Sequence, residues 1–300
     1  MSGTIIARIT GGLGNQLFIY AAARRIAAAR GARLFLDRDS AFQRDKYGAI
    51  DQLGHFAIVA DRARGGDVFA TPWGRRKREL LRSWSKRLPR DRKFIVTEAD
   101  FPDGDFTTPL RRKVRLEGYW QSARYFAPID AAIRQELRVT TPLGEMSRNV
   151  AAEIASRNAV CLHVRQRRGE ALVPGMAAPS RLPQLPFSYY ERAVAIIAER
   201  VADPVFFCFG DDAGWLPERW KFPYPARFVD HNRTQESAHQ DFALMRMCRH
   251  FIVANSTFSW WTAYLGEHPG KIVVAPKSTG ELAWASEPDI LPPEWIALDP

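Results

Sequence analysis

The sequence is poor in cysteine and contains no long apolar run. Its three cysteines, Cys161, Cys208 and Cys248, all lie in apolar segments and lack the spacing of metal ligands. We therefore expect reduced core residues of a cytoplasmic protein, which argues against a disulfide framework and against a zinc site. No segment has the roughly 18 consecutive apolar residues that a transmembrane helix needs. The first residues enter a strand-like run without the apolar core of a signal peptide.

Acidic residues are outnumbered, and the excess positive charge is concentrated in one segment. Residues 75–93 contain ten Lys or Arg against Glu79 and Asp91, and so supply most of the net charge of +10. The wider segment Trp73–Lys93 repeats apolar residues at helical spacing, which predicts a basic amphipathic helix. Such a helix could contact an anionic membrane surface or be a solvated surface helix. Nucleic acid is not expected as a partner, because aromatic interleaving and a recognisable binding fold are lacking.

The first forty residues alternate strand and helix patterns around a glycine-rich turn. Ile5–Ile9 is an apolar strand candidate, and Gly11–Gln16 follows it directly. Apolar residues then keep helical spacing to Ala29, and Arg33–Leu36 is a second strand. This βαβ pattern directs backbone N–H groups and a helix N-terminus at an anion. The alternative is a tight turn without a ligand.

Two other interpretations of this unit depend on Asp37, which ends the second strand. An acidic residue at this distance from the glycines is typical of a dinucleotide site. However, Leu17 stands where the fingerprint has its third glycine, and no Lys-Ser/Thr pair makes the turn a P-loop. Asp37 and Asp39 also have the Asp-x-Asp spacing of metal-dependent sugar transferases, although a solvated turn explains the same pattern.

Three strand candidates in the second half of the chain each end in a polar turn. They are Val160–Val164, followed by Arg165–Glu170; Pro204–Phe209, followed by Gly210–Asp212; and His250–Ala254, followed by Asn255–Ser259. Ligands of α/β sheets bind beyond the carboxyl ends of the strands. Arginines there offer forked donors to a phosphate or a carboxylate. Together with the first βαβ unit, these strands predict an α/β protein with two Rossmann-like domains that face each other across a cleft.

Turn residues at Thr140–Gly144 mark the predicted domain boundary. The N-terminal domain is expected to span residues 1–143 and the C-terminal domain residues 144–280. Residues 281–300, which are rich in proline, are expected to form a tail.

Four motifs, taken in chain order, form a recognisable set. They are Gly11–Phe18 with Tyr20–Arg24, then His163–Glu170, then Phe207–Trp215, and finally Asp241–Leu244 with Asn255–Leu265. The set resembles the α-1,2-fucosyltransferases of glycosyltransferase family 11, from residue 3 to about residue 276. The resemblance implies a GT-B fold and an inverting, metal-independent transfer of L-fucose from GDP-fucose to the 2-hydroxyl of a galactoside. No cofactor is implied.

The resemblance also implies roles for the residues. Residues 1–143 become the acceptor side, and residues 144–280 bind the GDP-sugar. Fixed guanidinium, N–H and hydroxyl donors would stabilise the charge that develops on the departing GDP. Arg165 would meet the β-phosphate, and His163 and Asp241 would hold the guanine and ribose side. The implied substrate-binding residues are Gly12, Gly14, Asn15, Gln16, His163, Arg168, Asp211, Asp241, Ser256, Thr257 and Ser259.

The arginine motif departs from the family pattern His-x-Arg-Arg-x-Asp. Two additional residues separate His163 from the carboxylate, which is Glu170. If the motif is aligned on His163, Arg165 is its first arginine. If it is aligned on Glu170, Arg167 and Arg168 are its two arginines. Two residues of extended chain span about 6.6 Å, so both sets cannot meet one phosphate. We favour His163 with Arg165. Glu170 is the candidate general base, or else a structural partner of Arg168.

The predicted protein is therefore a cytoplasmic α-1,2-fucosyltransferase of surface-glycan or O-antigen biosynthesis. Its partners would be GDP-fucose and a galactose-terminated glycan, with a peripheral contact to the inner membrane face through Trp73–Lys93. Another GDP-linked 6-deoxy sugar as donor stays open. The competing hypotheses are an NAD-type oxidoreductase and a non-catalytic glycan- or membrane-binding protein of the same fold.

Overall fold

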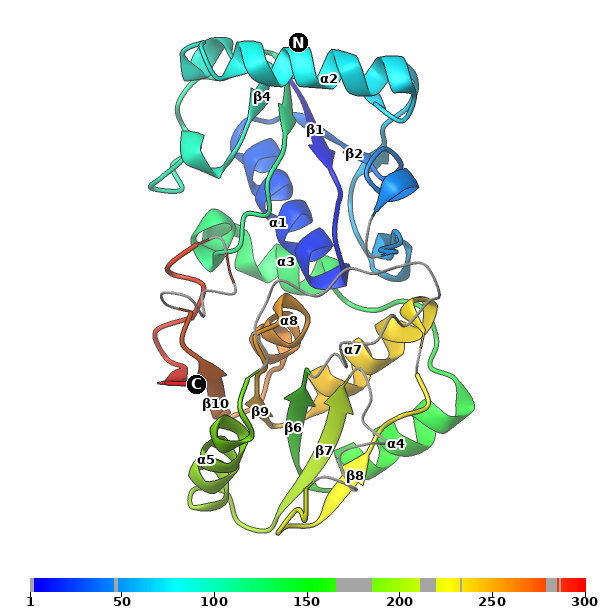
Figure 1. The fold of residues 1–300 in the computed structure, drawn as a ribbon, viewed down its shortest axis with the longest axis vertical. Helices are drawn as coiled ribbons and strands as arrows, with labels where there is room; N and C mark the ends of the chain where they lie inside the picture. The colour runs from blue at the N-terminus through cyan, green and yellow to red at the C-terminus, as the bar shows by residue number, and fades with distance from the viewer. Residues whose placement is uncertain are drawn as a thin grey trace. The chain divides into compact units, whose positions relative to one another are not determined.

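A computed structural model describes residues 3–45, 48–165, 185–210, 220–232, 234–278, 285 and 287–300. The chain divides into two compact units, Met1–Thr140 and Thr141–Pro300, which are described separately (Figure 1). The domain limits expected at residues 143 and 280 stay predictions. No helix among the described residues is long and apolar enough to cross a membrane.

Unit 1 contains a parallel sheet in the order β3-β2-β1-β5-β4. Its strands are β1 (Thr4–Arg8), β2 (Arg33–Asp37), β3 (Asp61–Arg62), β4 (Ile95–Val96) and β5 (Lys113–Leu116), and its helices are α1 (Leu13–Ala29), α2 (Pro72–Ser85) and α3 (Asp130–Glu136). The centre of β1 is apolar and buried, as expected of a strand covered on both faces. Helix α1 packs against β1. Strand order reverses between β1 and β5.

Unit 2 contains a second parallel sheet, in the order β11-β10-β9-β6-β7-β8. Its strands are β6 (Asn158–Val164), β7 (Pro204–Gly210), β8 (Ala226–Phe228), β9 (His250–Ile252), β10 (Val273–Pro276) and β11 (Ile296–Leu298), and its helices are α4 (Glu145–Ala155), α5 (Phe187–Ala198), α7 (Ala238–Met247) and α8 (Thr257–Leu265). Within the predicted tail, Ile296–Leu298 pairs with β10 as an edge strand. Strand order reverses between β6 and β9.

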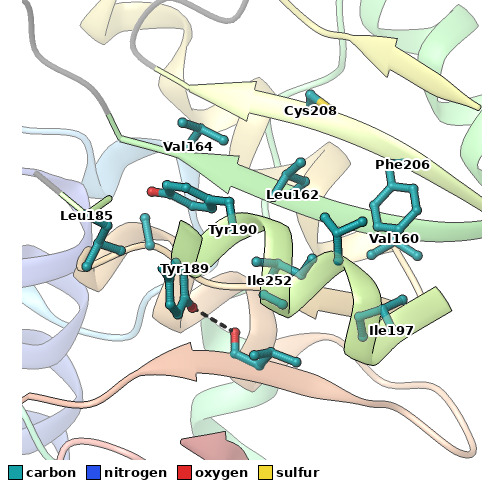
Figure 2. Packing of buried hydrophobic residues seen from close by; sticks show 14 of the residues in the cluster. Val160, Leu162, Val164, Leu185, Tyr189, Tyr190, Ile197, Phe206, Cys208 and Ile252 are labelled. Atoms are coloured by element: carbon teal, nitrogen blue, oxygen red, sulfur yellow. Dashed lines mark hydrogen bonds between the residues drawn. The ribbon is translucent and has the colours of Figure 1, made fainter. Parts of the chain in front are cut away.

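The alternation of side chains along β6 divides the core of unit 2 from its polar edge. Val160, Leu162 and Val164 point to the face that α5 covers, where they pack with Tyr190 and Ile197 (Figure 2). Successive residues of a strand face opposite sides, so Cys161 and His163 point to the other face. The Tyr189 hydroxyl donates to the backbone carbonyl of Val253 at 2.7 Å and also approaches that of Val274 at 3.5 Å, which ties α5 to the sheet.

Candidate active site

Arg165 lies at the carboxyl end of β6 and reaches the neighbouring strand connection. Its Nη1 donates to the backbone carbonyl of Asn255 at 2.9 Å, and its backbone N–H donates to the Tyr190 hydroxyl at 3.4 Å. Because β6 and β9 pair directly, the segments that follow them share one edge of the sheet. This edge is the point of strand-order reversal, where ligands of open α/β sheets bind.

The turn after β9 presents the N-terminus of α8 at the same edge. Ser256 is the N-cap, and its hydroxyl oxygen accepts from the backbone N–H of Phe258 at 3.3 Å. Thr257, the first helical residue, is half-buried, and the first turn contains no acidic residue. The end of a helix where backbone N–H groups are exposed attracts anions. A guanidinium and a helix N-terminus therefore favour negative charge at this edge.

Ser259 supports this turn from within. Its side chain is only 1% exposed, and its hydroxyl donates to the backbone carbonyl of Ser256 at 3.3 Å. This bond gives the Ser259 hydroxyl a structural role in the turn. Its predicted contact with a phosphate stays a prediction.

His163 lies buried on the face of β6 opposite α5. Its ring centroid lies 6.0 Å from that of Phe258 in the first turn of α8. Phe258 in turn meets Phe242 of α7 edge-on, with 5.6 Å between the centroids. Aromatic contacts thus connect the end of β6 with the first turns of α7 and α8, which brings His163 close to the Arg165 edge.

Asp241 lies in the first turn of α7 and is held by a side chain from the preceding loop. Its Oδ1 accepts a hydrogen bond from Asn232 Nδ2 at 2.7 Å. Burial raises the pKa of Asp241 to about 7, and the Asn232 bond opposes that shift. Asn232 also donates to the Ser147 hydroxyl at 3.2 Å, and the His231 ring Nε2 lies 2.8 Å from the same hydroxyl. Burial thus favours the protonated form of the Asp241 carboxyl group.

The glycine-rich turn of unit 1 leaves the N-terminus of α1 open. Gly12 is the N-cap with φ −65° and ψ 168°, no side chain caps the helix, and the first turn has no acidic residue. Gly14 lies in that first turn. Asn15 Oδ1 accepts from Gln121 Nε2 at 2.9 Å, which joins the segments after β1 and β5 across the point of strand-order reversal. The backbone groups of this turn are thus arranged for an anion.

Gln16 is buried and bonded to protein groups. Its Nε2 donates to the carbonyls of Gly11 at 2.8 Å and Ile50 at 2.7 Å, and its Oε1 accepts from the backbone N–H of Gln52 at 2.9 Å. These bonds hold the glycine turn against residues 50–52. They account for Gln16 without a ligand, and its donor contact stays a prediction.

Several predicted site residues lie outside the described part of the chain. They are Arg168, Glu170 and Asp211. Arg167 of the alternative motif register lies there as well. The structure describes the arginine motif only as far as Arg165.

The Asp37 and Asp39 carboxylates have separate structural partners. Asp37 is buried and accepts from the backbone N–H of Ser40 at 3.0 Å and from its hydroxyl at 2.5 Å. Asp39 forms a surface ion pair with Arg62. This geometry is that of a turn in which Asp37 caps the backbone that follows it. Among the described residues, no three His, Cys, Asp or Glu side chains gather as potential metal ligands.

Sequence reasoning missed three polar partners of this site. Asn255 was included only as part of a strand-end turn, yet its carbonyl receives the Arg165 guanidinium. Gln121 follows β5 and binds Asn15. Asn232 has no sequence signal of its own, because its pairing with Asp241 depends on how the loop before α7 folds.

Comparisons with known proteins identify the family of this chain and its fold. A family model described as glycosyl transferase family 11 matches residues 103–299. The chain belongs to glycosyltransferase family 11. It is 26% identical to an α-1,2-colitosyltransferase of Escherichia coli, over 98% of this chain and 99% of the relative. It is 28% identical to the O-antigen biosynthesis glycosyltransferase WbnK of Escherichia coli, over 90% of this chain and 92% of that protein.

Solved structures extend the likeness to the fold. The fucosyltransferase NodZ from Bradyrhizobium matches this family 11 member with a TM-score of 0.57 and 15% sequence identity, over 88% of this chain and 93% of NodZ. The predicted GT-B-like α/β class is confirmed. Family membership likewise confirms the prediction of a glycosyltransferase enzyme, and neither the oxidoreductase nor the non-catalytic hypothesis receives support.

Proposed function

We propose that this family 11 enzyme transfers L-fucose from GDP-fucose to the 2-hydroxyl of a galactoside during the synthesis of a surface glycan such as an O-antigen. The observation that carries the proposal is the hydrogen bond from Arg165 to the Asn255 carbonyl beside the N-terminus of α8. A diphosphate requires a fixed guanidinium and N–H donors of this kind. NodZ, which has a similar fold, was soaked with GDP-fucose and co-crystallised with GDP.

The reaction is proposed to be a single inverting displacement. The acceptor oxygen forms a bond to the anomeric carbon while the bond from that carbon to the β-phosphate oxygen breaks. The hydroxyl proton passes to a general base, for which Glu170 is the candidate, and GDP leaves with the bonding electrons. Arg165 and the α8 N-terminus would stabilise the charge that grows on the β-phosphate. The chemistry of this donor set needs no metal.

The other predicted residues are assigned to the two parts of the GDP portion of the donor, the guanosine and the diphosphate. His163 and Asp241 are proposed to face the guanine and ribose, together with Asp211, which follows β7 in the sequence. Ser256 and Thr257 would meet the phosphates, and Ser259 would hold their turn. In unit 1, the turn that contains Gly12, Gly14 and Asn15 would complete the diphosphate site, with Gln16 holding that turn in place. Arg168 would belong to the same phosphate region.

A second donor is favoured by one specific observation. The similar α-1,2-colitosyltransferase is matched over almost its full length, so a colitosyl donor is the alternative to fucose. Both hypotheses place the reaction in the cytoplasm, where nucleotide sugars are made, and at the membrane if the acceptor is lipid-linked.

A transfer assay tests the proposal. Purified protein is incubated with GDP-fucose and a β-galactoside, with and without EDTA, and the product linkage is determined by NMR. We expect an α-1,2-fucoside that forms equally in EDTA. Transfer from a GDP-colitose donor only would overturn the fucose assignment, and abolition by EDTA would overturn metal independence.

A further inference from the structure

Helix α2 carries an apolar stripe that faces solvent. Trp73 is 73% exposed, Leu80 61% and Trp84 62%. Their spacing of seven and four residues places all three on one face of the helix. Figure 1 shows α2 as one straight cyan helix at the margin of unit 1. Exposed tryptophans in line on one helix are unusual for a surface that meets only water.

Basic side chains flank this stripe. Arg76 and Lys77 are exposed and lie three or four residues from both Trp73 and Leu80, so they are their neighbours on the helix surface. Arg87 is exposed in the turn that follows α2, three residues after Trp84. Within the described residues, none of the three basic side chains has an ion pair or hydrogen bond. The stripe and its basic borders together form what we name the α2 outer face: Trp73, Arg76, Lys77, Leu80, Trp84 and Arg87.

The opposite side of α2 is fastened to unit 1. Arg78 Nε and Nη2 donate to the two carboxylate oxygens of Glu117 at 2.5 and 2.6 Å. The Ser85 hydroxyl oxygen accepts from the backbone N–H groups of Phe94 and Ile95 at 3.0 and 2.9 Å. These contacts set the rotation of the helix about its own axis. The α2 outer face is therefore held outward by the fold.

We propose that the α2 outer face docks unit 1 on a bilayer that contains anionic phospholipid. Tryptophan favours the region between headgroups and acyl chains, leucine the acyl boundary, and Lys and Arg the lipid phosphates. A second copy of the chain is a poorer occupant, because a two-fold contact through this face would set its basic residues against one another. The binding to lipid does not depend on the proposed function. Only its purpose, access to a lipid-linked acceptor, rests on that function.

Co-sedimentation of the full chain with vesicles tests the inference without donor or acceptor. The vesicles are phosphatidylcholine alone or phosphatidylcholine with phosphatidylglycerol. We expect binding to the anionic vesicles, weakened by salt. The double variants Trp73→Gln/Trp84→Gln and Arg76→Glu/Lys77→Glu should each lose binding by about tenfold or more.

Two control double variants test whether a general loss of exposed apolar surface or of positive charge explains the result. Met146→Gln/Met247→Gln removes exposed apolar side chains from unit 2, and Arg112→Glu/Arg200→Glu reverses two exposed charges elsewhere. Both controls should bind like the wild type. All variants should transfer fucose to a soluble galactoside as the wild type does. If the wild type itself transfers no fucose, the proposed function fails, but the vesicle-binding result is unaffected. Equal binding by the α2 variants, or vesicle-free dimers that only these variants abolish, would overturn the proposal.

Discussion

The guanidinium of Arg165 and the backbone carbonyl of Asn255 lie 2.9 Å apart, although ninety residues separate them in the chain. The bond joins the ends of β6 and β9, where the strand order of unit 2 reverses. Unit 1 has an equivalent bond between Asn15 and Gln121, across the reversal between β1 and β5. In each sheet, the site most suited to an anion is thus fastened by a polar bond between distant segments.

The first prediction concerns Arg165. Arg165→Ala removes the charge beside the α8 N-terminus, and we expect kcat/KM for transfer to fall by about 100-fold or more. GDP affinity, measured by calorimetry, should fall with it. Arg200→Ala changes an exposed arginine of the same unit and should leave both quantities unchanged.

Comparison with Arg167→Ala decides the motif register. If Arg165 is the motif's arginine, its loss should reduce transfer far more than the loss of Arg167. Loss of transfer in Arg167→Ala alone would assign the phosphate to the other register.

The second prediction concerns Gly12. A Cβ added there would meet no protein atom within 4 Å, and the φ of −65° suits any residue. Gly12→Ala should therefore fold, with a stability loss of about 1 kcal/mol or less from the poorer N-cap. We expect kcat/KM to fall by about tenfold, because the methyl group would occupy space that the diphosphate approaches.

Gly66→Ala is the matched control, since its Cβ would also meet nothing within 4 Å. It should change neither the melting temperature nor kcat/KM. Full activity of Gly12→Ala would show that no ligand approaches this turn.

The third prediction concerns Gly210, which pairs with Val164 at the end of β7. A Cβ at Gly210 would lie 2.2 Å from the Val164 carbonyl oxygen, a backbone atom beside Arg165. Gly210→Ala should lower the free energy of unfolding by about 1–3 kcal/mol and should also reduce transfer. Urea unfolding and the transfer assay measure the two effects, and an unchanged midpoint would refute the predicted clash.

The fourth prediction uses the raised pKa of Asp241, about 7 against an ordinary 3.8. The folded state then binds this proton more tightly than the unfolded state, so the stabilising contribution is complete below about pH 4 and is lost as pH rises through about 7. Asp241→Asn keeps an acceptor for Asn232 but cannot ionise. Its free energy of unfolding should fall less than that of the wild type between about pH 4 and pH 8.

Urea unfolding at several pH values across this range provides the measurement. Asp289→Asn, which changes an exposed carboxylate of the same unit, is the matched control. Parallel profiles for wild type and Asp241→Asn would contradict a raised pKa.

The sequence predicted the local features of the site well. Apolar runs predicted the strands β1, β2, β6, β7 and β9, and the hydroxyl residues before α8 include its N-cap. The family was recognisable because its motifs are short, local and ordered. These features depend on residues a few positions apart, and the period of the side chains is enough to predict them.

Other features could not be predicted because they depend on distant segments. Gln16 was predicted to bind substrate, which stays a prediction, and no local pattern indicates the bonds that its amide makes to Gly11, Ile50 and Gln52. Asn232 carries no motif, and only the folded loop brings it to Asp241.

The sequence by itself determined the βαβ turn with its glycines, the strand that delivers His163 and Arg165, and the basic amphipathic character of α2. Only the tertiary structure decided that the β6 and β9 ends are neighbours and that the tryptophans of α2 face outward while Arg78 is fastened to Glu117. The physical reason is the sequence distance over which each kind of interaction acts. Backbone propensity and side-chain period act within a few residues, whereas strand pairing and the choice of a buried helix face depend on packing between segments far apart in the chain.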